Sequence, residues 1–504
     1  GVAVSPDGGT VVTTWQRTDR RAGPADLVTD LVAIEVASGE RRVLASDGRA
    51  FDAPAISPDG TQLACVAQDL GAPERPADVT LVLLPLTGEV PTTSGDAPAG
   101  RDLTADLDRW PEDPVWTPDG RALVVAVDDH GHRRLLRVEV ADGEQRWLTD
   151  AGAYSDVRLP PAGGLFALRS EIGAAPRPVR LEVDRTAVSE AVASDPAASD
   201  PAALDPSAAD PSATADPSAA GRAPAWRELP SPVGEDPSGT CVERLHTIVE
   251  DGTEVGSWLV RPRNADADTP APLLLLIHGG PFSSWNAWHW RWNPHVLAAA
   301  GFAVLLPDPA LSTGYGQAHL ARGWGRWGTT PASDVLAAVE DAATRAEVDA
   351  SRVAAAGGSF GGYLANWLAG TTDRFGAIVT HASLWSLRAF HGTTDLGVHW
   401  EREFGDPYLD PARYLAASPD QHVARITTPM LVIHGEQDLR VPISEGMALW
   451  TDLVRHDVEA RLLYLPDEHH WVLKPQHARL WYRTVLAFLA EHLDGVPFER
   501  PELL

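Results

Sequence analysis

The residues best suited to chemistry are a serine, an acid and a histidine in the second half of the chain. Ser359 stands in a Gly-x-Ser-x-Gly pattern at 357–361, between an apolar run at 353–356 and a helical stretch. That context is typical of a nucleophile elbow, in which a sharp turn from strand to helix exposes the serine hydroxyl. Because a serine hydroxyl is a weak nucleophile, it needs a general base and an acid that orients the base.

Suitable acids and bases follow two later apolar runs, in the chain order that α/β-hydrolases use. The run at 430–433 leads into His434-Gly435-Glu436-Gln437-Asp438, and the run at 461–465 leads into Pro466-Asp467-Glu468-His469-His470. We predict Asp438 as the acid and His470 as the base, with Glu436 and His469 as alternatives. Adjacent histidines do not share a helix face and no His-Glu-x-x-His pattern occurs, so we expect no catalytic metal.

Catalysis at a carbonyl group also needs two preorganised N–H donors for the oxyanion. One donor is expected from the backbone of Phe360, the residue after the nucleophile. The other is expected from His278-Gly279-Gly280-Pro281, which follows the apolar run at 273–277. Its glycines allow the backbone to approach a substrate oxygen closely. The donor atom belongs either to Gly279 or to the side chain of His278.

A group of tryptophans follows this loop, at positions 285, 288, 290 and 292. We interpret them as packing residues, directed against another domain or a partner subunit. A substrate-lining role is the alternative.

Strand and helix signals alternate around these residues, from about residue 236 to the C-terminus. Apolar runs occur at 273–277, 302–306, 353–356, 377–380, 430–433 and 461–465, and helical stretches at 333–347, 363–369, 444–454 and 476–492. Continuous apolar strands separated by helices predict a mostly parallel sheet that is covered on both faces. In such sheets the chemistry lies at the carboxyl ends of the strands. The predicted fold class is therefore a doubly wound α/β-hydrolase.

A repeated turn pattern marks the first part of the chain. Val4-Ser5-Pro6-Asp7-Gly8, Ile56-Ser57-Pro58-Asp59-Gly60 and Trp116-Thr117-Pro118-Asp119-Gly120 each precede an apolar run, and Pro160-Pro161-Ala162-Gly163 is a degenerate fourth copy. Pro-Asp-Gly presets one φ angle, caps the turn and permits a positive φ. Repeats of roughly 40–50 residues with short strands indicate β-propeller blades. We expect a propeller-like domain over residues 1–235. Because four copies are few for a closed propeller, blades are truncated from it or too divergent to see.

A low-complexity segment interrupts this domain at about 187–225. Asp-Pro recurs in it among alanine and serine, at 195–196, 200–201, 205–206, 210–211 and 216–217. Repeated proline blocks regular structure and the composition cannot bury apolar area. We interpret the segment as a linker-like insertion, with a protein-binding role as the less favoured alternative.

The composition excludes several classes of partner. Lys+Arg number 41 and Asp+Glu 70, which gives a formal net charge of −29. Nucleic acids and anionic membranes require basic patches, so neither is an expected partner. Two cysteines are too few for a disulfide framework. No apolar run of about 18 residues occurs, and no signal peptide is visible after Gly1, which leads us to expect a cytoplasmic protein.

With these residues in place, the chain resembles the prolyl oligopeptidase family of serine peptidases. Within that family it looks most like the acylaminoacyl-peptidase and dipeptidyl-aminopeptidase-like branch. The motifs that carry the resemblance are HGGP at 278–281, LSTGYG at 311–316, GGSFGGY at 357–363, HGEQDLRVP at 434–442 and EHHWVLKP at 468–475. The resemblance implies that a propeller caps the active site of an α/β-hydrolase domain at 236–504 and limits substrates to short peptides.

The resemblance also implies roles for single residues. It favours Asp438 over Glu436 as the acid, and His470 over His469 as the base. It places Arg440 near the carbonyl of substrate residue P2, although a salt bridge is an equally weighted alternative. It implies an apolar S1 pocket lined by Phe360 and by residues near Trp385. Two departures from the family are the short propeller region and the Asp-Pro insertion.

These observations predict a serine peptidase that hydrolyses short peptides through an acyl-enzyme intermediate. The expected products are N-terminal acylated residues or dipeptides, and no paired glutamates that would hold a free N-terminus are identifiable. A carboxylesterase on the same fold is the alternative, and a non-catalytic interaction protein is the third hypothesis. No cofactor and no metal are expected, and a homo-oligomer is left open.

Overall fold

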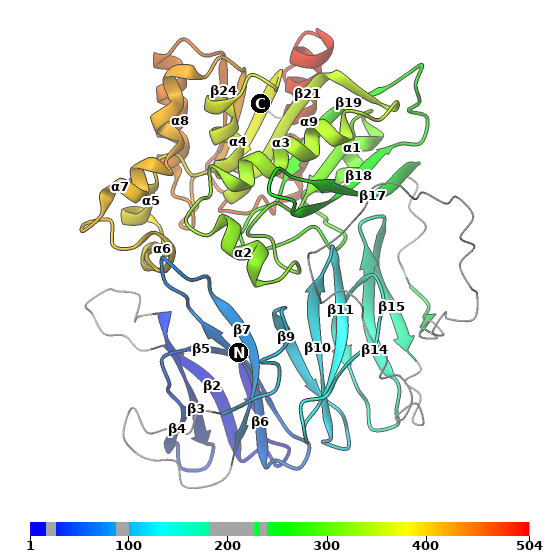
Figure 1. Cartoon of the computed structure of the whole chain (residues 1–504), viewed down its shortest axis with the longest axis vertical. Coiled ribbons are helices and arrows are strands. Elements are labelled where there is room, and N and C mark those ends of the chain that lie inside the picture. Colours follow the sequence, from blue (N-terminus) through cyan, green and yellow to red (C-terminus); the bar gives the residue numbers. More distant parts are fainter. Residues whose placement is uncertain (17–26, 87–99, 182–225, 232–238, 503–504) are drawn as a thin grey trace, which may run out of the picture.

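The computed structural model describes residues 1–16, 27–86, 100–181, 226–231 and 239–502. Figure 1 shows an all-β part at the bottom, in blue to teal, and a part that mixes strands and helices at the top. The Asp-Pro segment predicted at 187–225 and the boundary predicted at 235/236 lie outside the described residues. We propose a domain boundary between the last strand of the first part, β16 (Trp226–Glu228), and the first strand of the second, β17 (Thr240–Ile248).

Antiparallel strands in groups of four build the all-β part, as expected for a propeller-like domain. A single parallel bridge between Arg133 and Ala153 joins the third and fourth groups into one larger sheet. The groups are β1 (Val2–Val4), β2 (Thr10–Gln16), β3 (Thr29–Glu35) and β4 (Arg41–Ala45); β5 (Ala50–Ile56), β6 (Gln62–Asp69), β7 (Asp78–Pro85) and β8 (Arg101–Asp102); β9 (Pro111–Trp116), β10 (Ala122–Asp129), β11 (His132–Glu139) and β12 (Gln145–Trp147); and β13 (Ala153–Arg158), β14 (Leu165–Glu171), β15 (Ala174–Leu181) and β16.

The repeated turn of the sequence joins the first two strands of each group. In the second group the Ser57 hydroxyl donates to Asp59 at 2.6 Å and accepts from the Gln62 N–H at 2.9 Å, while Gly60 has φ +73°. Residues 5–10 and 117–122 make the same contacts, and 160–163 forms the fourth turn. The repeat therefore predicted the unit of this domain correctly.

A separate sheet of mostly parallel strands forms the framework of the C-terminal part. Its strand order is β17-β18-β20-β19-β21-β22-β23-β24, in which β18 pairs antiparallel with β17 and β20 while the remaining pairs are parallel. The bounds are β18 (Glu254–Pro262), β19 (Ala271–Ile277), β20 (Ala303–Pro307), β21 (Val348–Gly358), β22 (Ala377–His381), β23 (Met430–Gly435) and β24 (Ala460–Leu465). The expected α/β-hydrolase fold is confirmed, and β17 and β18 are additions that the sequence analysis did not predict.

Helices cover both faces of this sheet, as the continuous apolar strands require. Successive leucines of β19 alternate between the two faces: Leu273 and Leu275 lie in one apolar core, Leu274 and Leu276 in the other. The first core includes α3 (Thr330–Ala342), α4 (Phe360–Thr371) and α8 (Ile443–Arg455), and the second includes α1 (Pro294–Ala299) and α9 (Pro475–Asp494). The remaining helical segments are α2 (Gln317–Gly323), α5 (Leu387–Thr393), α6 (Gly397–Phe404), α7 (Pro411–Ala416) and the 3-10 turn Pro419–Arg425.

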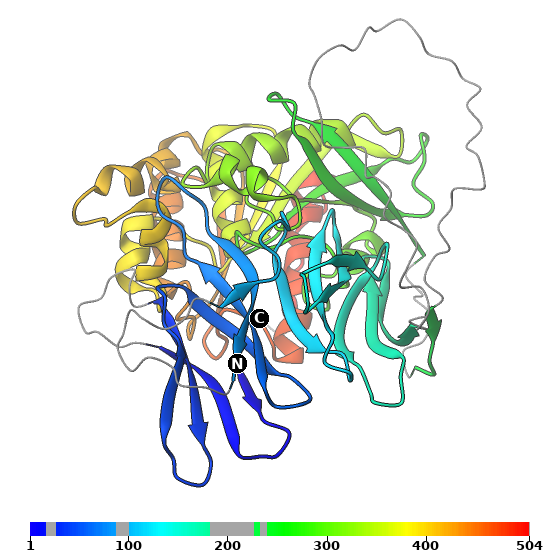
Figure 2. The ribbon, with the colours of Figure 1, turned by 60° about the horizontal axis from the view of Figure 1, so that its bottom comes forward.

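The two parts meet along one side of the all-β domain, seen from below in Figure 2. Asp128 of β10 accepts hydrogen bonds from Asn286 at 2.8 Å and from Thr313 at 2.7 Å. The indole of Trp324 donates to the carbonyl of Ala72 at 2.8 Å. The all-β domain therefore contacts the loops at the carboxyl ends of the hydrolase strands. Among the described residues, no helix has the length and apolar character needed to cross a membrane.

Candidate active site

The predicted nucleophile lies on a strained turn at the end of β21. Ser359 separates this strand from α4 and has φ 58° and ψ −123°, a backbone conformation that a serine adopts at a cost. Its N–H donates to the carbonyl of His381 at the end of β22, at 2.9 Å. Because the contacts of the surrounding strands hold the backbone in this form, the turn has the geometry of a nucleophile elbow.

A glycine at position 361 is required by close backbone packing at this turn. A Cβ atom on Gly361 would lie 2.2 Å from the carbonyl oxygen of Ile277 at the end of β19. That distance is too short for any side chain, and backbone atoms cannot swing away. The second glycine of the Gly-x-Ser-x-Gly pattern is therefore needed because the elbow packs tightly on the neighbouring strand.

The predicted acid and base contact each other directly. His470 Nδ1 lies 2.7 Å from Asp438 Oδ2, and the backbone N–H groups of Arg440 and Val441 donate to Asp438 Oδ1, both at 2.9 Å. Asp438 follows β23 and His470 follows β24, so both lie at the sheet edge that carries Ser359. The carboxylate fixes the imidazole with Nδ1 as the donor, which leaves Nε2 to act as a base.

The carboxylate of Asp438 is held in its charged form. Burial raises its pKa, but the nearby ring of His434 and the hydrogen bonds from His470 and the Val441 N–H outweigh burial and hold the pKa well below its usual range. His434 is fully buried, lies 3.6 Å from Asp438 Oδ2 and donates from Nε2 to the carbonyl of Val441 at 2.8 Å. Asp438 is thus suited to orient a histidine and to stabilise its protonated form.

The two alternative residues lie outside this pair. Glu436 and His469 are exposed, and His469 accepts a hydrogen bond from the N–H of Trp471 at 3.1 Å. Within the described residues, no hydrogen bond joins Ser359 Oγ to the ring of His470. Such bonds are often long until a substrate is bound. The geometry favours the set Ser359, Asp438 and His470.

The oxyanion loop lies directly against the nucleophile. A Cβ atom on Gly279 would come within 3.4 Å of Ser359 Cβ, so the glycine backbone faces the serine at close range. Phe360 is the first residue of α4, so its N–H has no acceptor within the helix, and the helix N-terminus favours negative charge. Both predicted donors therefore lie beside Ser359.

The side chain of His278 is engaged inside the protein. Its Nδ1 donates to the carbonyl of Gly279 at 2.7 Å, and its Nε2 accepts from the hydroxyl of Ser312 at 2.9 Å. Burial lowers the pKa of His278 to about 4, so the ring is neutral and this tautomer satisfies both nitrogens. Of the two expected alternatives, the geometry favours the Gly279 N–H as oxyanion donor. His278 then acts as a positioning residue for the loop.

Trp385 and Arg440, which the resemblance associated with substrate, each have partners within the protein. Trp385 is buried. Its indole N–H donates a hydrogen bond to Asp452 of α8 and its backbone N–H donates one to Glu445, both at 2.8 Å. It packs behind the site, in the same apolar core as Phe360. Arg440 is half exposed and donates from Nε to Asp395 at 2.8 Å. This ion pair is the alternative role that was considered for Arg440, and its contact with a substrate carbonyl stays a prediction.

Two buried carboxylates that the sequence analysis missed hold the catalytic loops. Glu468 accepts hydrogen bonds from the Leu473 and Lys474 N–H groups and from His477, which closes the loop that carries His470. Asp308 accepts from the N–H of Trp285 at 2.7 Å and from the hydroxyl of Tyr315 at 2.6 Å, which anchors the oxyanion loop. Both lie within or beside quoted motifs, but nothing in their spacing distinguishes a buried acid from an exposed one.

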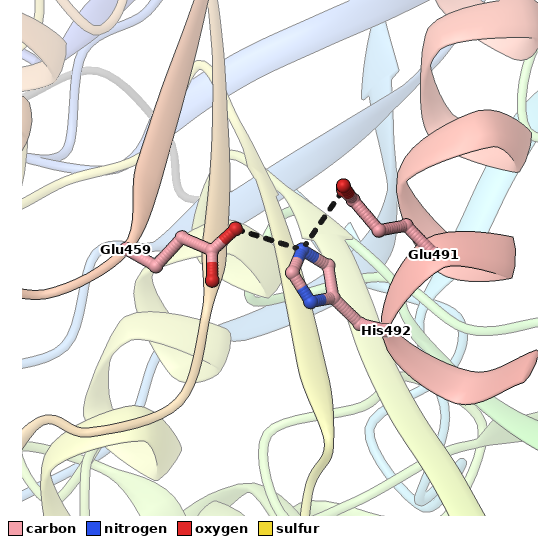
Figure 3. Close-up of side chains that lie close together, drawn as sticks. All are labelled: Glu459, Glu491 and His492. Atoms are coloured by element: carbon pink, nitrogen blue, oxygen red, sulfur yellow. Dashed lines mark ion pairs between the residues drawn. The ribbon is translucent and has the colours of Figure 1, made fainter. Parts of the chain in front are cut away.

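A cluster of possible metal ligands lies away from these loops (Figure 3). Glu459, Glu491 and His492 bring one ligand atom each to within 4.8 Å of one another. Glu459 precedes β24 and the other two end α9, so the cluster lies at the amino ends of the strands, opposite Ser359. Arg461 already pairs with Glu491 at 2.5 Å, which makes the cluster a charge network rather than a metal centre.

The chain is similar in sequence to known proteins. Residues 288–496 match the model of the prolyl oligopeptidase family. A probable dipeptidyl-peptidase 5 of Aspergillus clavatus is 30% identical over 416 residues, which cover 79% of this chain and 52% of the relative. The chain thus spans about half the length of the curated relatives it matches.

Solved structures share the fold over the whole chain. An acylaminoacyl peptidase of Pyrococcus horikoshii superposes with a TM-score of 0.76 at 16% identity, covering 100% of this chain and 72% of the other. A puromycin-hydrolyzing peptidase of Mycobacterium tuberculosis superposes with a TM-score of 0.68 at 19% identity, covering 99% of this chain and 79% of the other. At these identities the likeness concerns the fold alone.

Proposed function

From the match of residues 288–496 we infer that the chain belongs to the prolyl oligopeptidase family, and from that premise we propose that it is a serine peptidase acting on short peptides. Ser359 is the nucleophile, His470 the general base and Asp438 the orienting acid. The observation that carries the proposal is the 2.7 Å contact between His470 Nδ1 and Asp438 Oδ2, at the sheet edge that presents Ser359 on a strained turn.

The mechanism follows from these positions. Ser359 Oγ attacks the scissile carbonyl carbon while His470 Nε2 takes the hydroxyl proton, and Asp438 stabilises the imidazolium. The N–H groups of Phe360 and Gly279 donate to the oxyanion. The C–N bond then breaks, and His470 returns its proton to the leaving amine. Water attacks the acyl-enzyme, loses a proton to His470 and releases the acid, and Ser359 regains its proton.

The substrate end that the enzyme recognises is a finer part of this proposal. A relative named dipeptidyl-peptidase 5 supports release of dipeptides, whereas the acylaminoacyl peptidase fold neighbour supports release of acylated residues. The all-β domain lies against the loops around the site, so its contacts favour short peptides over folded proteins. Release of dipeptides and release of acylated residues both require Ser359 to cleave an amide.

Matched substrates test the proposal. We would measure kcat/KM for the p-nitroanilides of one dipeptide, N-acetylated and free, with a p-nitrophenyl ester as reference and Ser359→Ala as control. We expect hydrolysis of at least one anilide and loss of both anilide and ester turnover in the variant. The acetyl-to-free ratio then assigns the exopeptidase type. Hydrolysis of the ester alone would support the carboxylesterase alternative. Wild-type activity in Ser359→Ala would show that Ser359 is not the nucleophile.

A further inference from the structure

A pocket with a volume of about 150 Å³ adjoins the outer side of the catalytic histidine. His470 forms part of its wall, and most of the remaining wall is aromatic or aliphatic: Trp290, Trp292, Trp471, Leu473 and Trp481. Ser359 does not line it. The pocket is therefore next to the site but distinct from the elbow and the oxyanion loop.

The inner wall of the pocket is rigid. The ring of Trp292 meets the ring of Trp481 edge to face, with 4.7 Å between the centroids. Trp292 also packs so closely on Gly358, the residue before the nucleophile, that a Cβ atom there would lie 2.7 Å from the indole. The hydroxyl of Tyr482 accepts from the Asn293 N–H at 2.9 Å and fixes the same loop to α9. A wall held in this way is shaped before any ligand binds.

The mouth of the pocket holds large apolar side chains in solvent. Trp290 is 64% exposed, Leu473 58% and Trp471 46%. The guanidinium of Arg291 lies 3.8 Å over the ring of Trp471 and holds that ring in place. Exposed apolar groups around a hollow are a feature of binding sites rather than of ordinary surface.

His381 adds a neutral ring to the pocket, whose arginine, Arg291, is stacked on Trp471. His381 lines the pocket, is buried and donates from Nε2 toward the carbonyl of His470 at 3.5 Å. Burial lowers the pKa of His381 to about 3, so its imidazole is neutral. A neutral aromatic wall favours an apolar ring over a charged group.

The position of the pocket identifies which half of a substrate it meets. Phe360 and Trp385 lie in the apolar core on one face of the sheet, whereas Trp481 lies in the core on the other face. His470 gives its proton to the leaving amine, so the group bound against its outer side belongs to the leaving half. The acyl half then lies on the Phe360 side.

We propose that this pocket is the S1′ subsite and that it binds an aromatic side chain at P1′, the first residue of the leaving group. The inference rests on the proposed peptidase function. An apolar cavity of about 150 Å³ takes up one benzene ring, which matches the side chain of phenylalanine. The chemistry is unchanged: the P1–P1′ amide bond breaks and the departing amine carries the ring.

A competition assay tests the subsite. One fixed acyl dipeptide, taken from the best-cleaved anilide, is joined to Ala-amide, Leu-amide or Phe-amide, and the three peptides are mixed. Release of each amino-acid amide, followed by mass spectrometry, gives ratios of kcat/KM directly. We expect Phe to exceed Ala by about 10-fold or more, since a ring gains more from apolar burial than a methyl group.

Variants connect that preference to the pocket. Ala478→Trp fills the pocket from α9 and should reduce the Phe-to-Ala ratio to near 1 while the Ala peptide is still cleaved. Leu473→Ala opens the mouth at an exposed position that folding does not depend on, and should reduce the ratio by about threefold. Leu409→Ala is the matched control, because this leucine is 85% exposed and does not line the pocket.

The outcomes separate the two claims. Equal cleavage of Phe and Ala peptides by the wild type, or an unchanged ratio in Leu473→Ala, would overturn the subsite while leaving the peptidase intact. Failure to cleave any peptide, together with failure to react with a fluorophosphonate, would overturn the proposed function and the subsite with it.

Discussion

At the scale of single residues, the site depends on how one carboxylate is held. Asp438 receives two backbone N–H groups on one oxygen and His470 on the other, so its charge and its direction are both fixed. The hydrogen bonds outweigh burial and keep its pKa low, which preserves the charge through the neutral range. Asp438 therefore stays ionised throughout turnover and does not exchange a proton.

Replacing Asp438 by asparagine should disturb catalysis far more than folding. The amide keeps the shape but offers a donor or a neutral acceptor to His470, which no longer favours the required tautomer. We expect kcat to fall by about 10⁴-fold, the loss seen for this change in a comparable triad. Stopped-flow or end-point assays on the anilide give kcat, and far-UV circular dichroism checks the fold. A loss below about 10-fold would show that Asp438 is not the orienting acid.

The sequence predicted these residues because their chemistry is tied to motifs. Ser359, Asp438 and His470 each follow an apolar run, and a parallel sheet brings the ends of such runs together. Glu468 and Asp308 were missed because burial of an acid depends on tertiary contacts that no spacing records. The sequence also could not separate packing tryptophans from tryptophans beside the site. In the structure Trp285 is buried in the core, whereas Trp290 is exposed beside the site.

At the scale of elements, α8 supports the loop after β22 through a buried acid. Glu445 lies in the first turn of α8 and accepts from the N–H groups of Trp385 and Ser386, both at 2.8 Å. Burial raises the pKa of Glu445 to about 7, against the effect of these hydrogen bonds. The folded protein therefore holds a proton that the unfolded chain releases near pH 4.5.

This difference predicts a pH-dependent stability that Glu445→Gln removes. Between about pH 4.5 and 7 the folded state binds more protons at this site, so its contribution to the free energy of unfolding falls as pH rises. The slope is at most about 1.4 kcal/mol per pH unit. Urea unfolding at pH 5, 6 and 7 should give a flatter profile for Glu445→Gln, with the exposed Glu254→Gln as control. Parallel profiles for wild type and Glu445→Gln would contradict the assignment.

The elements themselves followed from the sequence to different degrees. The apolar runs of β19 and β21–β23 are buried on both faces, which makes them continuous and easy to recognise. Strands β17 and β18 mix buried and exposed residues, and their antiparallel pairing at the sheet edge leaves no comparable run. The repeat predicted the four-stranded groups because the Pro-Asp-Gly turn fixes a local geometry that tertiary contacts do not alter.

At the scale of the whole molecule, polar contacts bind the all-β domain to the loops that carry the site. Asp128 is mostly buried and bonds to Asn286 and Thr313 across the interface, as well as to Arg133 within its own sheet at 3.4 Å. Asn286 belongs to the loop that continues from the oxyanion glycines. The position of the all-β domain and the shape of the site are thereby coupled. No pattern in the sequence indicated that Asp128 contacts Asn286 and Thr313.

Asp128→Ala should therefore weaken the attachment of the two domains. It removes the two hydrogen bonds across the interface together with the Arg133 contact, and we expect the free energy of unfolding to fall by about 2 kcal/mol. Asp69→Ala is the matched control, because Asp69 pairs with Arg75 in solvent, where such a pair contributes less than about 1 kcal/mol. Urea denaturation of both variants makes the comparison. Equal losses would show that Asp128 contributes no more than a surface charge.

The most direct test of the central claim is where a serine-directed probe reacts. After treatment with a fluorophosphonate, tryptic peptides of the protein are mapped by mass spectrometry, and the labelling rate is compared with those of His470→Ala and Ser359→Ala. We expect one modified residue, Ser359, labelled about 10³-fold more slowly without His470 and not at all in Ser359→Ala. Labelling of another serine, or an equal rate in His470→Ala, would contradict a nucleophile at Ser359 activated by the pair His470 and Asp438.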